Sequence, residues 1–187
     1  MWCRKRHVNH LMIAIAAMSL VPTGARAEDG APPRWQIDVK AAYVVLGARA
    51  ARSTGGIMPS ITALHRWPVR EAVDIGIGAD VGLFGFGGDA HWLGVLGGPM
   101  AAGRVSPFRV PLTFELAARL DVGRLPVCNA RGLCSRYLGF FPSVETGAAY
   151  QSTQNAAVVV TCGVRFIQTL AWSGVSVEPA VAGRLSW

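Results

Sequence analysis

The sequence lacks long apolar runs. After residue 34 no stretch of 18 consecutive apolar residues occurs in this chain of 187 residues, which excludes membrane-spanning helices because each needs about 20 such residues. The 3.6-residue period of an amphipathic helix is missing from the same region. The length allows one domain with a sizeable core, and that domain is predicted to be built from strands.

Charge is also scarce. Only 16% of the residues are charged, and Lys5 and Lys40 are the only lysines. Surfaces of soluble proteins carry about 25–35% charged residues. The composition therefore argues against a domain whose polar side chains face bulk water.

The N-terminus has the pattern of a secretory signal. Arg4, Lys5 and Arg6 precede the apolar stretch Leu11–Val21, and Ala25-Arg26-Ala27 provides small residues for a peptidase. We expect residues 1–27 to be a cleaved signal peptide, with a retained anchor as the alternative. Residues 28–34 form a polar leader, which we expect to be disordered.

Net charge gives little support for nucleic-acid binding. The formal charge is +7, but the signal holds four of the 18 basic residues and none of the 11 acidic ones, which leaves about +3 after cleavage. A high pI alone would suggest nucleic acid. Because the excess lies mostly in the export segment, no nucleic-acid partner is predicted.

Cysteines are few. Cys128 and Cys134 flank a short polar stretch, and in an exported chain this spacing predicts a disulfide, with two free thiols as the alternative. Cys162, in an alternating segment, is interpreted as a small buried hydrophobic residue. Zinc needs about four ligands, and no histidine or second cysteine pair lies near. No metal site is predicted.

Alternation with period two recurs along the chain and predicts strands. Within 73–84 the odd positions from Val73 to Leu83 are apolar, whereas Asp74, Asp80 and glycines occupy the even ones. Eight such segments are predicted: 35–46, 58–67, 73–84, 92–104, 110–123, 138–151, 156–167 and 175–187.

The connections alternate in length. An even number of strands with long loops on one side and short turns on the other is typical of a closed barrel in a bacterial outer membrane. The connection near Thr169–Ala171 is short and departs from this rule. The long connections are Ala48–Ile57, Gly85–His91 and Arg124–Arg136, and the short ones are Pro68–Glu71, Val105–Arg109 and Ser152–Asn155.

Three features predict that the apolar faces point outward. The segments reach the nine to eleven residues of a membrane strand, whereas strands of globular proteins have about five or six. The polar faces consist mainly of small residues, which suit a narrow lumen. Aromatic residues gather near segment ends, as in interfacial girdles; they are Trp35, Trp67, Trp92, Phe108, Tyr137, Tyr150, Trp172 and Trp187.

The closing segment resembles the C-terminal signature of outer-membrane β-barrels, with alternating hydrophobic residues and a final aromatic. The resemblance implies that Leu185 and Trp187 form the signal read by the insertion machinery. Over 35–187 the chain is similar to small eight-stranded barrels of the outer membrane protein A and X type. This implies an all-β, eight-stranded, antiparallel up-and-down transmembrane barrel in the cell outer membrane, in contact with the lipid bilayer and lipopolysaccharide. The resemblance is architectural and carries over no functional residue.

Three prolines fall inside predicted strands. A closed barrel has no free edge for a residue without an N–H. We therefore expect Pro99, Pro142 and Pro179 to lie at bulges or strand ends.

Acidic and basic side chains alternate into the predicted lumen. An eight-stranded barrel is just wide enough for side chains, and buried charges must pair because leaving them unpaired is costly. A plugged lumen and a structural or surface-interaction role are therefore predicted. The alternatives are a narrow ion or solute channel and a soluble secreted barrel that binds an apolar ligand. The ion-pair candidates are Asp74, Asp80, Glu115, Arg119, Asp121, Glu145, Arg165, Glu178 and Arg184, with Asp38, Lys40 and Arg66 also facing inward.

Enzymatic function has weak support. Some outer-membrane barrels modify lipopolysaccharide near the outer leaflet with a serine, a histidine and an acid. Here no serine lies close in sequence to Asp89 and His91. His65 lies near a predicted periplasmic turn, at the opposite end of the barrel from that chemistry. The glycines of 82–88 lack the Lys-Ser/Thr of a phosphate loop. A lipid-modifying enzyme is the least favoured function, and no catalytic residue or cofactor is predicted.

Overall fold

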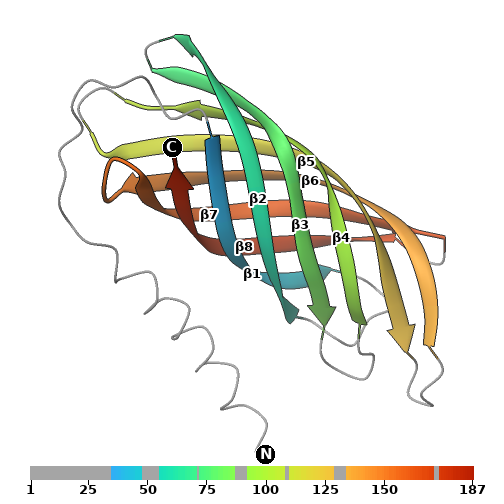
Figure 1. Ribbon diagram of the computed structural model, residues 1–187. Helices are drawn as coiled ribbons and strands as arrows, with labels where there is room; N and C mark the ends of the chain where they lie inside the picture. The colour runs from blue at the N-terminus through green and yellow to red at the C-terminus, as the bar shows by residue number, and fades with distance from the viewer. Residues whose placement is uncertain are drawn as a thin grey trace, which may run out of the picture.

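The computed structural model describes residues 35–47, 55–70, 72–86, 92–107, 110–128, 134–170 and 173–187. They form eight antiparallel strands in one closed up-and-down barrel (Figure 1), which confirms the predicted fold. The predicted signal peptide (1–27) and leader (28–34) lie outside these residues. The strands are β1 Trp35–Gly47, β2 Gly55–Arg70, β3 Val73–Phe86, β4 Trp92–Val105, β5 Leu112–Cys128, β6 Cys134–Gln151, β7 Ala156–Thr169 and β8 Ser173–Ser186.

Each strand pairs with its sequence neighbours, and β1 closes the barrel against β8. Trp35 and Trp187 exchange two backbone hydrogen bonds of 3.0 Å across this closing pair. Their end of the barrel, which also carries the connections after β2, β4 and β6, is called the terminal end below. The connections after β1, β3, β5 and β7 lie at the opposite, loop end. The described residues include no helix able to cross a bilayer.

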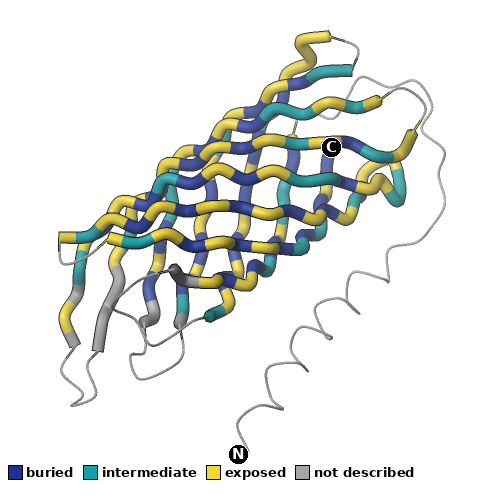
Figure 2. Tube along the Cα trace, turned by 180° about the vertical axis from the view of Figure 1, so that it is seen from behind, coloured by how far each residue is buried: buried dark blue, intermediate teal, exposed yellow. Residues whose placement is uncertain are grey.

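The apolar faces point outward. Buried and exposed residues alternate along every strand (Figure 2), because successive side chains of a strand point to opposite faces of the sheet. Ile75, Phe114 and Val177 are 48%, 51% and 43% exposed, whereas Arg119 is only 3% exposed. The expected orientation is confirmed.

Aromatic side chains are exposed at the terminal end. Trp35, Trp67, Tyr150 and Trp187 all lie within a few residues of that end. The His65 ring packs between two of them, with ring centroids 4.8 Å from Trp35 and 4.5 Å from Trp67. This cluster has the position of an interfacial girdle.

The cysteine-bearing connection is shorter than predicted. Residues expected in the loop Arg124–Arg136 continue β5 to Cys128 and begin β6 at Cys134. The first connection shortens likewise, because β2 begins at Gly55. Backbone pairing extends these hairpins beyond the region where side chains alternate, so period two alone underestimates strand length.

The prolines contradict the expectation of bulges or strand ends. Pro99, Pro142 and Pro179 lie within β4, β6 and β8, and the register of their ladders is the same on both sides of each proline. No register shift is needed, because each proline pairs normally with one neighbouring strand. In the ladder with the other neighbouring strand, two residue pairs at the proline are missing.

The position predicted for Cys162 was wrong. It lies on the outer face of β7 and is an exposed free cysteine. A cysteine on that face replaces an outward apolar side chain and not a core residue.

The two cysteines of the predicted disulfide lie on the neighbouring strands β5 and β6. Cys128 and Cys134 are register partners; their side chains lie outside the described ones. Directly opposed residues have Cα atoms about 4.5–5.5 Å apart, which fits the range of about 4.4–6.8 Å for disulfides.

We predict that alkylation of the denatured mature protein without reductant modifies one thiol, Cys162, and that prior reduction raises the number of modified thiols to three. Three adducts without reductant would contradict the disulfide.

Candidate functional site

Among the described residues, thirteen charged side chains form ion pairs in the lumen, and all eight strands contribute to them. They form three networks, one at the terminal end, one in the middle and one toward the loop end. The carboxylates are Asp38, Asp74, Asp80, Glu115, Asp121, Glu145 and Glu178, and the cations are Lys40, Arg66, Arg104, Arg119, Arg165 and Arg184.

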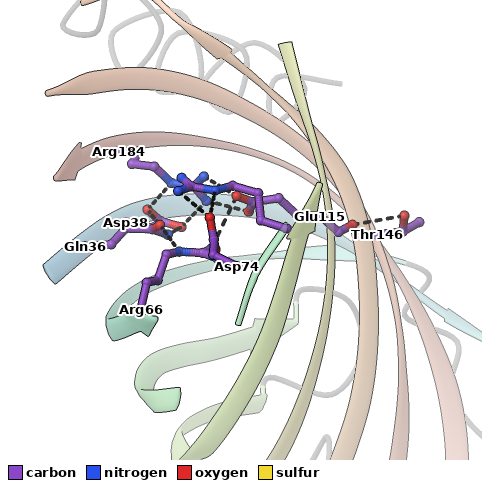
Figure 3. Close-up of polar contacts among 8 residues, drawn as sticks. Gln36, Asp38, Arg66, Asp74, Glu115, Thr146 and Arg184 are labelled. Atoms are coloured by element: carbon purple, nitrogen blue, oxygen red, sulfur yellow. Dashed lines mark hydrogen bonds and ion pairs between the residues drawn. The ribbon is translucent and has the colours of Figure 1, made fainter. Parts of the chain in front are cut away.

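The terminal-end network is centred on Arg184 of β8 (Figure 3). Its guanidinium donates Nε to Asp38 Oδ1 and Nη2 to Asp38 Oδ2, both at 2.8 Å. It also pairs with Glu115 of β5, with Nη2 2.6 Å from Oε2. One arginine thereby joins three strands through charge-assisted forked hydrogen bonds, a geometry that lysine cannot provide.

Arg66 of β2 continues the same network. Its Nη1 lies 2.6 Å from Asp74 Oδ1, and its Nη2 lies 3.3 Å from Glu115 Oε1. Its Nε donates to Gln36 Oε1 at 2.6 Å. Arg104 of β4 pairs with the other oxygen of Asp74 at 2.6 Å. The three arginines and three carboxylates balance, so this end of the lumen is neutral.

The middle network is built on Glu145 of β6. Lys40 Nζ and Arg119 Nη1 both lie 2.6 Å from its Oε2. Arg119 Nε is 3.8 Å from Asp80 Oδ2, and Asp80 Oδ1 has no partner among the described residues. Asp80 is therefore the most weakly paired of the seven carboxylates that the described part of the lumen contains, beside six bases.

The third network is the most deeply buried. Arg165 of β7 is 0% exposed and pairs with Asp121 of β5, also 0% exposed. Its Nε donates to Glu178 Oε1 of β8 at 2.8 Å, and Ser176 Oγ donates to the same oxygen at 2.9 Å. Because Arg165 is fully buried, it depends on both carboxylates for compensation of its charge.

Buried apolar residues form a layer in the lumen toward the loop end. Phe84 and Phe141 are 0% exposed, with ring centroids 6.4 Å apart. Each further member is also buried and lies near the loop end of its own strand; these are Val44, Met58, Leu96 and Ile167. This layer lies nearer the loop end than the three ionic networks.

A small cavity lies between the terminal-end and middle networks. The cavity beside Lys40, Arg119 and Glu145 has a volume of about 20 Å³, which is room for about one water. A wider pocket of about 280 Å³ lies at the turn from β2 to β3, where Arg70, Asp74 and Arg104 line it. No group of three metal-ligating side chains occurs in the described part of the chain.

Every predicted ion-pair candidate faces the lumen and lies in one of the three networks. His65 lies on the outer face, and Asp89 and His91 lie outside the described residues. Leu185 and Trp187, the predicted insertion signal, are exposed on the outside at 57% and 59%.

Sequence reasoning missed Arg104 and the apolar layer. Arg104 ends a segment, 92–104, that is broken by glycines and Pro99. Counting in steps of two from Met100 through Ala102 would have placed it inward. The same count from Asp80 would have placed Phe84 on the inner face. The count from Glu145 would have placed Phe141 there too.

The closed eight-stranded barrel, with its apolar outside and ionic lumen, is the fold of the small outer-membrane barrels. The chain matches no known family of sequences and no curated protein. Among solved structures it is similar to Neisserial surface protein A, with 18% identity over 82% of this chain and 97% of that one and a TM-score of 0.63. It is also similar to the N-terminal barrel of Pseudomonas aeruginosa OprF, at 13% identity over 80% and 97% with a TM-score of 0.51. For Ail, the attachment invasion locus protein of Yersinia pestis, identity is 9% over 83% and 99%, with a TM-score of 0.54. These likenesses establish the fold.

Proposed function

We propose that this chain is an outer-membrane barrel with a plugged lumen, and that it acts as a structural or surface-interaction protein through its loop end. The terminal end faces the periplasm in this proposal, and the loop end faces outward. Contact partners are the lipid bilayer and lipopolysaccharide, after insertion by the outer-membrane assembly machinery.

The apolar outer surface supports a membrane location. Large hydrophobic side chains are exposed on all eight strands; for example, Ile77, Leu116 and Val160 are each 59% exposed. Soluble monomers rarely expose apolar patches above about 300–600 Å². A belt that surrounds the whole barrel far exceeds this and is stable in lipid.

The ion pairing of the lumen side chains is the observation that supports the functional proposal. Asp74, Asp80, Glu115 and Arg119, which would line a channel, each lie in an ion pair. The Phe84–Phe141 layer adds a dry constriction of the kind that blocks conduction by dewetting. A barrel whose interior is occupied in this way acts through its surface.

The β5–β6 hairpin is the strongest candidate contact surface. At the loop end β6 pairs with β7 only up to Gly139↔Thr169. Among the described residues, Cys134–Leu138 therefore pairs with β5 alone. A free strand edge offers unpaired N–H and C=O groups to an extended partner segment. Two structures with this fold bear names that denote surface roles, Neisserial surface protein A and the attachment invasion locus protein Ail.

Fold and orientation can be tested together in cells. An epitope inserted between Ala130 and Arg131 is expected to be labelled on intact cells, whereas one inserted at Thr153 is expected to be labelled only after permeabilisation. The protein in detergent-extracted membranes should migrate differently in gels before and after boiling. Extraction without detergent, with no shift on heating, would favour the soluble secreted barrel.

The plugged lumen predicts electrical silence. Purified mature protein in planar bilayers is expected to show no discrete conductance steps, with a conducting porin in the same bilayers as the positive control. Reproducible small steps from the wild-type protein would contradict the plug and favour the narrow channel.

A further inference from the structure

Every even-numbered strand carries one proline at an outward position, and β2 also contains Pro68, two residues before its end. Three of the four side chains are exposed and one is half-buried, so all lie on the lipid side of the sheet. The four are Pro59 in β2, Pro99 in β4, Pro142 in β6 and Pro179 in β8.

Each of these prolines interrupts pairing with the following strand. Between β2 and β3 the ladder passes from Ile57↔Gly85 to Ser60↔Gly82 and omits the two positions at Pro59. The β4–β5, β6–β7 and β8–β1 ladders omit the two positions at their own prolines in the same way. Pro126 opens a second gap between β4 and β5 nearer the loop end.

The other four ladders have no interruption. Pairing runs without a gap from Trp35↔His65 to Val45↔Gly55 in β1–β2, and it is equally continuous in β3–β4, β5–β6 and β7–β8. These are the hairpins joined at the loop end. The barrel thus consists of four complete hairpins, and each of the four seams between them contains a proline gap.

The four gaps lie at a similar depth. Continuing the register across each gap places Leu83, Leu120, Phe166 and Tyr43 opposite the prolines. We compare each proline with the position that the backbone register assigns to the proline of the preceding even-numbered strand. It lies either at that position or closer to the terminal end. These displacements compensate for the stagger between the strands. A path along the hydrogen bonds would spiral along the barrel axis. The four prolines instead form a ring around the barrel at one depth, which is called the proline ring below.

A gap of this kind has a specific cost in a membrane. Proline has no N–H, so the carbonyl that faces it across the seam loses its normal partner. Lipid supplies no replacement donor. At this depth the seam therefore has fewer hydrogen bonds than the hairpin. The surrounding lipid does not replace the missing bond.

We propose that the proline ring divides the barrel into four hairpin modules. When the hydrogen-bond ladders of the barrel open locally, the seams between the modules open before the ladders within the hairpins. The β8–β1 seam that closes the barrel is one of these weakened seams. Local opening of the folded barrel is concentrated at the ring, while the β1–β2, β3–β4, β5–β6 and β7–β8 ladders stay closed.

Residue-resolved hydrogen exchange of the full mature protein in lipid nanodiscs tests this proposal. Seam amides within two residues of Pro59, Pro99, Pro142 and Pro179 should exchange at least about fivefold faster than hairpin amides at the same depth, the factor expected for one lost hydrogen bond. Equal rates in the two kinds of ladder would overturn the proposal, and this comparison needs no substitution.

Restoring one donor gives a second test. In Pro99→Ala, exchange around Leu120 in the β4–β5 seam should slow about fivefold, with no change in the β3–β4 ladder. Pro111→Ala, which lies before β5, is the matched control and should change neither. If Pro99→Ala leaves the β4–β5 seam as fast as before, or slows both ladders alike, the ring does not control opening.

Discussion

Replacing Arg165 with methionine is expected to lower the free energy of unfolding by about 3–5 kcal/mol, the cost of breaking a buried ion pair by removing one partner. The substitution removes the arginine that pairs with Asp121 and Glu178, whose side chains are buried at 0% and 1% exposure. Reversible urea unfolding in lipid vesicles, followed by gel mobility, measures the change.

Controls separate the loss of charge pairing from a general effect of removing arginine. Arg124→Met removes an exposed arginine in β5 and should change stability by less than about 0.5 kcal/mol. Combining Arg165→Met with Asp121→Asn and Glu178→Gln removes the stranded charges and should recover part of the loss. If the single variant is as stable as Arg124→Met, the third network contributes nothing to the fold.

Placing arginine on the lipid face should have the second largest effect. Val81 lies near the middle of β3 and is 59% exposed. In a membrane barrel, Val81→Arg should lower the free energy of unfolding by about 2–4 kcal/mol, because arginine at the midplane loses hydration. At an exposed site of a soluble barrel the same change stays within about 0.5 kcal/mol.

Gln168→Arg provides the matched control. Gln168 occupies the same outer face near the loop end of β7, where the cost of an arginine falls to about 0–1 kcal/mol. A large difference between the two variants locates the hydrocarbon region. Equal small effects at both sites would contradict the membrane assignment.

Strands and faces could be predicted because both follow from period two. Val73, Ile75 and Ile77 alternate with Asp74 and glycines, and this pattern contains the strand and its orientation. Strand ends were less accurate, since hydrogen bonding of β5 with β6 continues to Cys128↔Cys134 without help from side-chain alternation.

Ion-pair partners could not be predicted in the same way. Glu115 meets Arg184 across the lumen, and 69 residues separate them in the chain. Which inward residues meet depends on the stagger of all eight strands, and alternation leaves that stagger undetermined. The prolines were mispredicted for a related reason, since a strand in a closed barrel can leave one of its two ladders locally unpaired and keep its register.

The forked arginines have a consequence for how the barrel selects its alignment. If one strand slides by two residues against its neighbour, every greasy side chain still faces outward, so lipid contact cannot distinguish the slid arrangement from the native one. The slide does move Arg165 away from Asp121 or Glu178, and Arg184 away from Asp38 or Glu115. Hydrophobicity thus decides which face of each strand contacts the bilayer. Ion pairing across the lumen decides which strand register is the most stable among those that expose the same apolar residues.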